Sequence, residues 1–547
     1  MNRILKSIFS GNPLFKKPTV KDYLLSLVLT VVLMGLHFYF VLPVISLFTF
    51  NFWLLVSIYI IIFICISIFV FKAYSKIYRT LIVVASLIII AAIGFSIFSS
   101  EPINASKYAS QMEVKEAKFT DSITSISLSE IPIVDKASAK QLGDKQIGMI
   151  TGLGSQYNVD PLYTLIIQNE KLYRVSPLEY EDFFKWFQNR GTGIPGYIKV
   201  NVNDPSDVKI VELDKGIKYS PKAYFSDNLF RHIRFKYPSF IFGDYSFELD
   251  DNDNPYWIIP VLKPEIGMYG GLDSQGVVIV DPHTGETNYY AIGEVPSWVD
   301  NVNSISTMWY QIDNWGYYVN GFFNTLFSKK DMIQTTEEYN FVSIDNQLHM
   351  FSSLTSVGSD NSIVGFALIN VKNKDATFIK VGGADEISAK NSAQGQVQHL
   401  NYVATDPILL NIGNVPTYFV GLKDQEGLVK MYSFVSVQDY SIVGVGNTVE
   451  EGRLNYLSKL KVSNPDDSVD LSVVEDEVIE ITQAIIDGNT NYYIRLAKDN
   501  KLFIGSINLS VELPLTKVGD RVKIEYLTST TNAISITNFD NLNIDFQ

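Results

Sequence analysis

The densest cluster of oxygen-bearing side chains is an acidic turn at residues 250–255, Asp-Asp-Asn-Asp-Asn-Pro. Turns of this composition bind calcium, and the candidate ligands are Asp250, Asp251 and Asp253. An EF-hand loop would require Gly where Pro255 stands and Glu where Val261 stands. The alternative interpretation is a solvated hairpin turn between two strands. Calcium is therefore the one metal that the sequence suggests, and no organic cofactor is predicted.

A second cluster is basic and lies in an otherwise acidic part of the chain. It reads Arg231-His-Ile-Arg234-Phe-Lys236. Clustered cationic side chains bind phosphate and carboxylate groups, so Arg231, Arg234 and Lys236 are candidates for contact with an anionic polymer. The alternative is that these cations pair with acidic side chains of the same chain, such as those at 250–253.

A third cluster is aromatic. Residues 296–328 hold three of the six tryptophans together with several Tyr and Phe. Trp and Tyr favour surfaces that have one apolar and one wet side. The candidates for contact with a partner protein or with the membrane surface are Trp298, Trp309, Trp315, Tyr317 and Tyr318. The alternative is a helical segment whose aromatic side chains pack in the core.

The common catalytic signatures are missing from the sequence. It contains no Gly-x-Ser-x-Gly, His-Glu-x-x-His or Gly-x-x-x-x-Gly-Lys motif. Its only cysteine, Cys65, lies in an apolar run, and the four histidines after residue 100 are far apart in sequence. No catalytic residue is therefore predicted. A pair of carboxylates has no sequence motif, so a hydrolase of that kind stays open.

Three apolar runs without Asp, Glu, Lys or Arg stand near the N-terminus: Tyr23–Phe48, Phe52–Phe71 and Leu81–Phe98. A helix needs about 20 apolar residues to cross a bilayer, with a lower limit of about 17. The first run is too long for the core of a signal peptide. The sequence therefore predicts three transmembrane helices within 23–98, preceded by a tail at 1–22.

Basic residues predict the orientation of these helices. Those of residues 1–100 all lie in the N-terminal tail and in the loop at 72–79. Both segments belong on the cytoplasmic side, so we expect a plasma-membrane protein with a cytoplasmic N-terminus and an extracytoplasmic C-terminal part. That part is acidic and lacks cysteine, which fits a Gram-positive cell envelope and argues against nucleic acid as a partner.

The exported part divides into three predicted segments. Residues 99–130 are rich in Ser, Thr and Glu and are interpreted as a stalk. Residues 131–462 show repeated α+β modules, each a hairpin or meander followed by a helix. Strands are predicted within 163–175, 197–202, 256–292, 364–381 and 416–445, and helices are predicted to begin near 295, 385 and 448. The fold class is therefore α+β.

The most clearly marked helix is Pro177–Asn189. Ser176 and Glu179 have the spacing of a capping box, and Pro177 suits a first helical turn. A buried stripe is predicted from four side chains at helical spacing, Tyr180, Phe183, Phe184 and Phe187.

Residues 463–547 begin with a polar linker at 463–467. Five β-runs follow, at 472–484, 492–497, 502–509, 521–527 and 533–537. Five short strands in this length predict a small OB-like β-barrel. Acidic side chains outnumber basic ones here, whereas a groove that follows a nucleic-acid backbone would be basic.

The run from Gly276 to Gly285, Gly-Val-Val-Ile-Val-Asp-Pro-His-Thr-Gly, resembles the closing hairpin of PepSY-type modules. Residues 417–460 are similar in style. The chain also resembles multi-span envelope proteins of low-GC Gram-positive bacteria, in segments 176–180, 193–197, 255–257 and 296–300. The resemblance implies small exported modules that restrain a protease or bind a ligand outside the cell.

Three classes of function follow from these patterns. The first is a membrane-anchored extracytoplasmic interaction or scaffold protein of the cell envelope. Its partners would be other envelope or membrane proteins and the lipid bilayer, with a homo-oligomer left open. The second class is a PepSY-like regulator that restrains an exported enzyme. The third is an exported carboxylate-dependent hydrolase.

Overall fold

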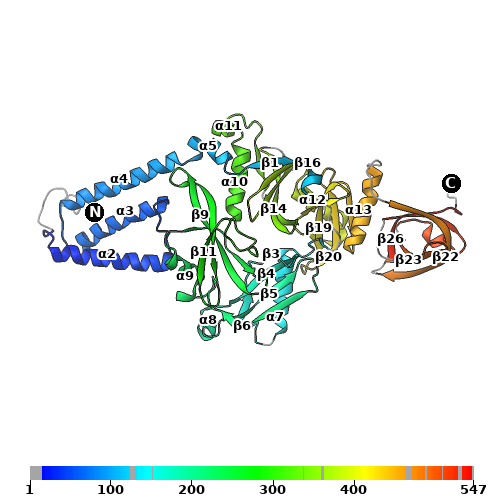
Figure 1. Cartoon of the computed structure of the whole chain (residues 1–547), viewed down its shortest axis with the longest axis horizontal. Coiled ribbons are helices and arrows are strands. Elements are labelled where there is room, and N and C mark those ends of the chain that lie inside the picture. The colour runs from blue at the N-terminus through cyan, green and yellow to red at the C-terminus, as the bar shows by residue number, and fades with distance from the viewer. Residues whose placement is uncertain are drawn as a thin grey trace.

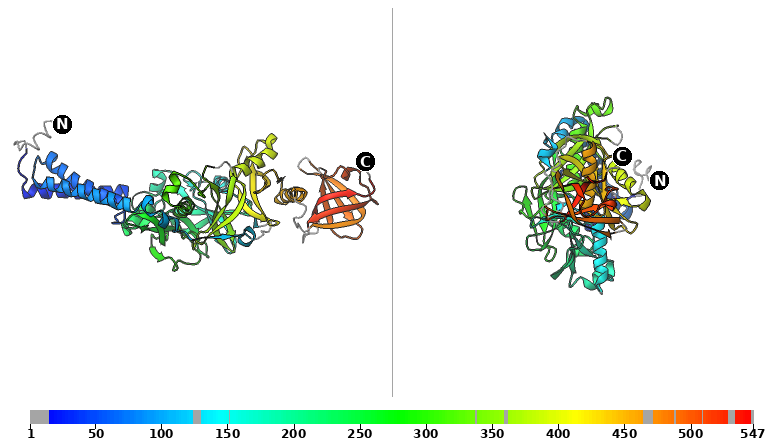
Figure 2. Two further views of the ribbon diagram at one scale, coloured as in Figure 1. Left: turned by 90° about the horizontal axis from the view of Figure 1, so that it is seen from above. Right: turned by 90° about the vertical axis from the view of Figure 1, so that its right-hand side faces the viewer.

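The computed structural model describes residues 15–123, 130–150, 152–336, 338–358, 362–463, 471–486, 489–507, 509–527 and 533–544. Along its long axis the chain forms three parts in sequence order (Figure 1, Figure 2). They are three long helices, a body of four β-sheets, and a small β unit at the C-terminal end. The mixed α+β class agrees with the prediction from the sequence.

The first part consists of α2 (Val20–Val41), α3 (Phe50–Cys65) with its π-helical continuation η1 (Ile66–Val70), and α4 (Ile77–Phe98). All three are long and apolar enough to cross a membrane, which confirms the predicted number of spans. A helix of 22 residues is about 33 Å long, and the hydrocarbon core is about 30 Å thick. α2 begins before the apolar run because Thr19 and Asp22 form a capping box at its start.

The predicted stalk at 99–130 is wrong, because most of its described residues belong to the folded body. They form α5 (Glu101–Ala109), β1 (Val114–Ala117) and α6 (Phe119–Ser122). Strand β1 pairs in parallel with a strand of the third sheet, and Phe119 and Ile123 are buried. The polar composition of this segment conceals these few anchoring residues. Residues 124–129 lie outside the described residues.

Four sheets form the body, and all four pair their strands in the same order. The first and second strands lie end to end on one edge of the third, and the third, fourth and fifth strands form an antiparallel meander. We call each sheet, with the helix that follows it, a unit. In unit 1 the strands are β2 (Tyr157–Val159), β3 (Thr164–Gln168), β4 (Lys171–Tyr180), β5 (Ile194–Asn201) and β6 (Val208–Ile217). In unit 2 they are β7 (Ile241–Phe242), β8 (Ser246–Leu249), β9 (Pro255–Ile266), β10 (Gly270–Val280) and β11 (Thr287–Ala291).

Units 3 and 4 repeat this arrangement. Unit 3 contains β12 (Ile333–Thr335), β13 (Asn340–Ile344), β14 (Gln347–Ser356), β15 (Ser362–Asn370) and β16 (Ala376–Ala384). Unit 4 contains β17 (Val403–Ala404), β18 (Ile408–Ile412), β19 (Val415–Lys423), β20 (Val429–Ser436) and β21 (Val443–Gly446).

The turn between the second and third strands is also repeated. In units 1, 3 and 4 it has two residues, both with positive φ: Asn169 and Glu170, Asp345 and Asn346, Gly413 and Asn414. Two consecutive residues in this conformation form the tight turn that matches the twist of a hairpin. Unit 2 replaces it with the longer acidic turn at 250–254.

Because the first and second strands pair with different halves of the third, the chain leaves the sheet edge between them. In each unit the first residue after the first strand still donates its backbone N–H to a carbonyl group of the third strand, at 2.8–3.0 Å. These donors are Asp160, Gly243, Thr336 and Thr405. The residues that follow are outside the ladder. We call residues 160–163, 243–245, 336, 338–339 and 405–407 the edge breaks.

A helix follows the last strand of each unit: α9 (Leu229–Lys236), α10 (Ile305–Tyr317), α12 (Glu386–Gln396) and α13 (Val449–Ser463). The helices predicted near 385 and 448 are confirmed, whereas the one predicted near Val295 begins only at Ile305. Helix α7 (Lys136–Met149) precedes unit 1, and α11 (Phe322–Leu326) follows α10. Short 3-10 turns are η3 (Phe225–Asp227), η4 (Gln398–Leu400) and η5 (Leu513–Leu515).

The predicted helix Pro177–Asn189 is wrong over its first half. Ser176 and Pro177 pair with β5, and Leu178 pairs with β2, so the capping-box pattern lies inside strand β4. The helix α8 (Phe183–Asn189) starts later, and Asp182 caps it. Pairing on both edges of β4 outweighs the local helix signal.

The C-terminal unit has five strands: β22 (Leu471–Ile486), β23 (Asn489–Leu496), β24 (Leu502–Ser506), β25 (Arg521–Leu527) and β26 (Ala533–Asn541). The long strand β22 pairs with both β23 and β25, and β24 pairs with β26, which in turn pairs with β25. The five strands thus close into a ring around an apolar core. Residues 464–467 of the predicted linker lie outside the described residues.

A buried pair of carboxylates connects units 1 and 2. Glu248 is fully buried and accepts hydrogen bonds from Ser246 Oγ (2.7 Å), the Asp300 N–H (2.8 Å) and the Asn301 side chain (2.8 Å). Asp300 accepts a hydrogen bond from the Ile167 N–H of unit 1 at 2.6 Å. Burial and the neighbouring Glu248 raise the pKa of Asp300 to about 7.

This pair predicts a pH-dependent stability. The pKa of Asp300 rises from 3.8 to about 7 on folding, so the folded chain retains a proton that the unfolded chain loses between these values. The contribution of Asp300 to the free energy of unfolding is therefore greatest at low pH. It is lost as the pH rises through about 7, by about 1.4 kcal/mol for each unit by which the two pKa values differ. We expect the melting temperature of the full-length protein to fall between about pH 5 and about pH 8.

The substitution Asp300→Asn should reduce this fall, measured by intrinsic-fluorescence melting. The control Asp251→Asn removes an exposed carboxylate and should leave the fall unchanged. An equal fall in wild type and Asp300→Asn would show that Asp300 is not its source.

Candidate functional site

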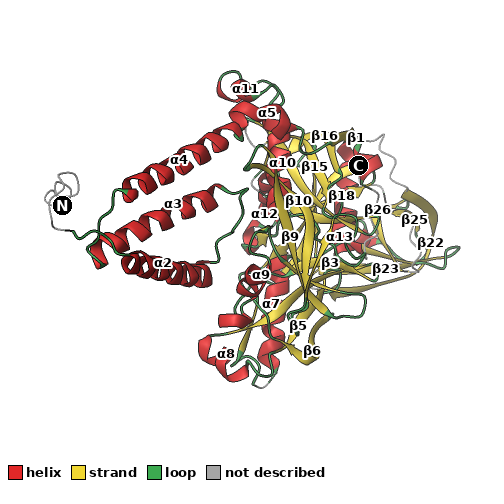
Figure 3. Ribbon diagram, turned by 60° about the vertical axis from the view of Figure 1, so that its left-hand side comes forward, coloured by secondary structure: helices red, strands yellow, loops and turns green. Residues whose placement is uncertain are grey.

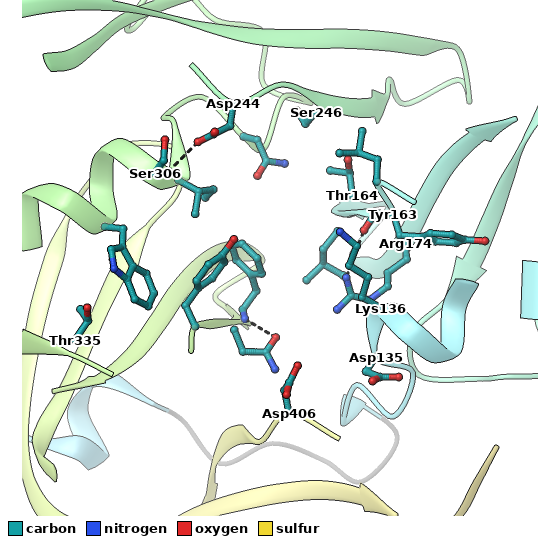
Figure 4. Close-up of a pocket in the computed structure, with 18 of the residues that line it drawn as sticks. Asp135, Lys136, Tyr163, Thr164, Arg174, Asp244, Ser246, Ser306, Thr335 and Asp406 are labelled. Atoms are coloured by element: carbon teal, nitrogen blue, oxygen red, sulfur yellow. Dashed lines mark hydrogen bonds between the residues drawn. The ribbon is translucent and has the colours of Figure 1, made fainter. Parts of the chain in front are cut away.

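The four edge breaks meet around an open cavity of about 980 Å³. Unit 1 contributes Leu162 and Tyr163, unit 2 contributes Asp244 and Tyr245, unit 3 contributes Thr336 and Tyr339, and unit 4 contributes Asp406. Figure 4 shows several of these side chains around the central space. The remaining lining residues come from α7, from α10 and the loop before it, from β4 and from strand ends next to the breaks, among them Lys136, Arg174, Asn301, Trp309, Asp313, Gln334 and Asn340.

Contacts between the second strands hold the edge breaks together. Strand β3 lies against β8, and β13 lies against β18. The Phe247 N–H donates to Thr164 Oγ1 at 3.1 Å, and the Asn340 side-chain amide donates to the Pro407 carbonyl at 3.2 Å. The cavity therefore forms at the centre of the repeated arrangement.

One wall of the cavity is cationic and carries Lys136 and Arg174 (Figure 4). Lys136 stands in the first turn of α7, beside the cap residue Asp135. The Asp135 carboxylate is occupied, because it accepts from the Ser138 N–H (2.9 Å) and from Lys423 Nζ (2.7 Å to each oxygen). It holds the end of the helix in place.

The two cations of this wall are poorly paired. Arg174 on β4 donates only long hydrogen bonds, of 3.4 Å, to the carbonyl oxygens of Val134 and Tyr163. Within the described part of the chain, no carboxylate lies within ion-pair distance of Lys136 or Arg174. Burial lowers the pKa of Arg174 to about 10, and burial together with the charge of Arg174 lowers the pKa of Lys136.

The wall formed by α10 is aromatic and acidic. The rings of Trp309 and Tyr339 meet edge to face with centroids 5.0 Å apart. Asp244 accepts hydrogen bonds from Ser304 Oγ (2.7 Å) and from the Ser306 N–H (2.9 Å) at the start of the helix. The aromatic faces and the nearby amide groups suit a polar ligand that also has an apolar face.

The acids of this wall differ in proton affinity. Burial raises the pKa of Asp244, but the hydrogen bonds from Ser306 and Ser304 outweigh it, so that the net shift is downward. Burial raises the pKa of Asp313 and outweighs the hydrogen bonds that its Oδ1 accepts from the Thr335 N–H (2.9 Å) and hydroxyl (2.8 Å). The pKa values of the two carboxyl groups are therefore shifted in opposite directions.

The structure distributes the five aromatic candidates over separate surroundings. Trp309 and Tyr317 line the cavity. Trp298 packs on Tyr256 and Trp315 packs on Phe378, and Tyr318 packs on Phe322. The exposed aromatic side chains of this segment are instead Tyr310 on α10 and, in and after α11, Phe323 and Phe327.

The basic cluster lies on α9, and its donors are engaged by carbonyl groups. Arg231 donates to Tyr39 and Phe225, Arg234 to Phe240 (2.6 Å), and Lys236 to Thr287 (2.7 Å). Burial lowers the pKa of Arg234 to about 10. The expected pairing with the acids at 250–253 is wrong, and the contact with an external anion stays a prediction.

The acidic turn is the hairpin connection between β8 and β9, which the sequence left open as the alternative to calcium. Asp250 accepts hydrogen bonds from the N–H groups of Asn252 and Asn254, each at 2.9 Å, and Asp253 pairs with Lys199 at 2.6 Å. Among the described residues, no group of three or more His, Cys, Asp or Glu side chains is placed to hold a metal ion. The calcium prediction at Asp250, Asp251 and Asp253 therefore has no support from the structure.

Sequence reasoning missed the residues of the cavity, apart from Trp309 and Tyr317. Lys136, Arg174, Asp244 and Asp313 belong to no motif and are far apart in sequence. Aligning the four repeats on their hairpin turns would have shown that the segments before the second strands are equivalent. A comparison of the sequence with protein-family models and with curated proteins finds no match.

The cationic wall predicts an unusual response to substitution. Removing a charge that has no ion-pair partner relieves its desolvation cost. We therefore expect Arg174→Met to leave the free energy of unfolding unchanged or to raise it by up to about 1 kcal/mol, with a matching change in the melting temperature. Lys423→Met leaves the Asp135 carboxylate without its partner and should cost about 2–3 kcal/mol. Thermal melting of the full-length variants measures both effects. A loss for Arg174→Met as large as that for Lys423→Met would mean that Arg174 is structural.

Proposed function

We propose that this chain is a membrane-anchored extracytoplasmic interaction protein of the cell envelope. It binds a polar, anion-bearing segment of a partner in the central cavity. The observation that carries the proposal is the cavity itself, to which all four units contribute and in which Lys136 and Arg174 have no carboxylate partner among the residues that the structure describes. A phosphate or carboxylate group of the ligand would supply the missing counter-charge.

The energetics of the cavity support a binding role. Desolvated cations without a partner destabilise a fold, so their presence is more easily explained by a ligand than by stability. The charges of Asp135 and Asp406 act on Arg174 without an ion-pair contact, and these two acids already pair with Lys423 and Lys390. The aromatic wall on α10 would bind the rest of the ligand by stacking and by apolar contact.

The modular interpretation belongs to the same proposal. Four units with one strand order support a small α+β module repeated along the chain, and PepSY-like modules are our proposal for their type. The ring of β22–β26, with β24 and β26 in parallel, supports an OB-like barrel. Other envelope proteins of a Gram-positive host are the proposed partners.

The cavity also favours a second candidate function, a carboxylate-dependent hydrolase. Asp244 contacts the first turn of α10, and Trp309 and Asp313 follow along the same helix. Hydrolases that act through two carboxyl groups keep one protonated and one ionised, and the pKa shifts of Asp313 and Asp244 have these opposite directions. An aromatic side chain between them would suit a sugar ring.

Anion binding tests the first proposal. With inorganic phosphate as the probe, the melting temperature of the full-length protein in detergent should rise with concentration, because a ligand that binds only the folded state stabilises it. The double variant Lys136→Gln, Arg174→Gln should lose most of this rise. Lys145→Gln is the matched control, since it removes an exposed cation from the same helix. Equal rises in all three proteins would overturn the proposal.

Asp313→Asn separates the two functions in the same experiment. For a binding protein this substitution leaves the response to phosphate intact and the protein inert toward cell-wall polysaccharide. For a hydrolase the wild type releases reducing ends from that polysaccharide, and Asp313→Asn abolishes the release.

Membrane orientation is tested by reporter fusions. Alkaline phosphatase fused after Gln547 should be active, because we expect that end outside the cytoplasm. The same reporter inserted after Lys76, in the loop before α4, should be inactive. The reverse pattern of activities would contradict the proposed orientation.

A further inference from the structure

The helix α8 and the turn η3 bring six aromatic side chains together at one end of unit 1. We call this group the aromatic tip; it consists of Phe183, Phe184, Trp186, Phe187, Tyr224 and Phe225. Trp186 is fully buried at its centre, with ring centroids 5.5 Å from Tyr224 and 5.7 Å from Phe225. Phe183 meets Tyr224 edge to face at 5.1 Å. These contacts fix the tip as one packed unit.

The outer side of the tip is exposed. Phe184 is 71% exposed, Phe187 57% and Phe225 52%. Each buried phenyl group would contribute about 2 kcal/mol, so leaving three of them in water is unfavourable. Arg190 adds a cation at the base of the tip, with its guanidinium 5.5 Å from the Trp186 ring and 5.3 Å from the Phe187 ring. Contiguous exposed apolar surface of this kind marks a contact site.

A single guanidinium group fixes the position of the tip relative to the end of helix α2. Arg231 on α9 donates from Nε to the Tyr39 carbonyl at 3.0 Å and from Nη1 to the Phe225 carbonyl at 2.5 Å. Its guanidinium also lies over the Tyr39 ring, 4.4 Å from the centroid. Tyr39 belongs to the last turn of the span Val20–Val41. Phe225 therefore lies level with the end of a membrane span.

Further contacts hold α9 against the same end of α2. The rings of Phe235 and Phe38 meet edge to face at 5.0 Å, and the Ile45 N–H donates to the Pro238 carbonyl at 2.8 Å. Figure 3 shows α9 near the end of α2, with α8 on the same side of the body. The tip and the end of the span are thus joined through α9.

We propose that the aromatic tip inserts into the bilayer leaflet that faces the body, beside α2. Its occupant is lipid, because a surface level with the end of a span meets the interfacial region of the membrane. Exposed phenyl groups beside an arginine match the composition of such interfacial segments, in which the cation stays at the headgroups. The proposal stands apart from ligand binding in the cavity, because it rests on none of the cavity residues.

Depth-dependent quenching in lipid nanodiscs tests this insertion. The full chain with Cys65→Ser has no thiol, so Phe187→Cys can carry a single bimane label. We expect lipids with a nitroxide near the carbonyl group to reduce its fluorescence by at least about twofold relative to unlabelled lipids. Tyr440→Cys is the control, because Tyr440 is 54% exposed and follows β20 in the chain, and β20 lies at the end of the body away from the three spans (Figure 1). Its label should respond to aqueous iodide and not to the lipids.

The result that would overturn the proposal is a Phe187→Cys label that behaves like the Tyr440→Cys label. Nanodiscs with one copy of the purified chain exclude a partner protein or a second copy as the source of protection. Phe184→Cys provides a second position on the exposed side of the tip, so that one poorly folded variant does not decide the outcome. Melting temperatures equal to that of Cys65→Ser confirm that the labelled chains are folded.

Discussion

The structure of the body depends on the way in which two short strands share one edge of a longer strand. Both short strands run antiparallel to the longer one and follow each other along it, and the residues between them are not paired with it as a continuous ladder. The backbone must leave the ladder between them, and its polar groups there need other partners or solvent. In four successive units this produces four edge breaks of the same kind. The second strands β3 and β8, and β13 and β18, pack together in pairs, so the breaks meet and leave a cavity where regular sheet would have closed it.

Several buried charged side chains of the body have hydrogen-bond or ion-pair partners close to them, and the cationic wall of the cavity differs in this respect. Glu248 is buried, but four donors surround it, and Lys390 reaches both Glu338 (2.6 Å) and Asp406 (3.3 Å). Asp135 combines a helix cap with an ion pair. Arg174 has only distant carbonyl groups. This difference between Arg174 and the paired carboxylates is what supports our proposal of anion binding in the cavity.

The body is attached to the membrane helices from two of its units. In unit 2 the turn between β9 and β10 lies on the end of α4, where Ser99 Oγ accepts hydrogen bonds from the N–H groups of Met268 (2.9 Å) and Tyr269 (3.2 Å). The Tyr269 ring also lies near Phe50 of α3 and Phe95 of α4. In unit 1, α9 binds the end of α2. The spans and the first two units are therefore held as one assembly, which sets the aromatic tip at a defined depth.

The sequence by itself determined the elements whose signals are local. The three spans follow from uninterrupted apolar runs, and the hairpins follow from turns such as Asn169-Glu170 between alternating strands. The helices after Asp385 and Thr448 follow from capping residues, and the five C-terminal strands follow from their spacing. The α+β nature of the units after residue 130 could be recognised for the same reason.

Only the tertiary structure decided which polar residues form a site. Ser176 and Glu179 have the pattern of a helix start, yet β4 pairs on both edges and they belong to a strand. The polar segment at 99–130 reads as a stalk, yet β1 pairs with β16. Lys136, Arg174, Asp244 and Asp313 come together because the edge breaks meet in space, and contacts between residues so far apart in sequence leave no local pattern. Their meeting depends on how the sheets pack, which is a property of the whole body and not of any one segment.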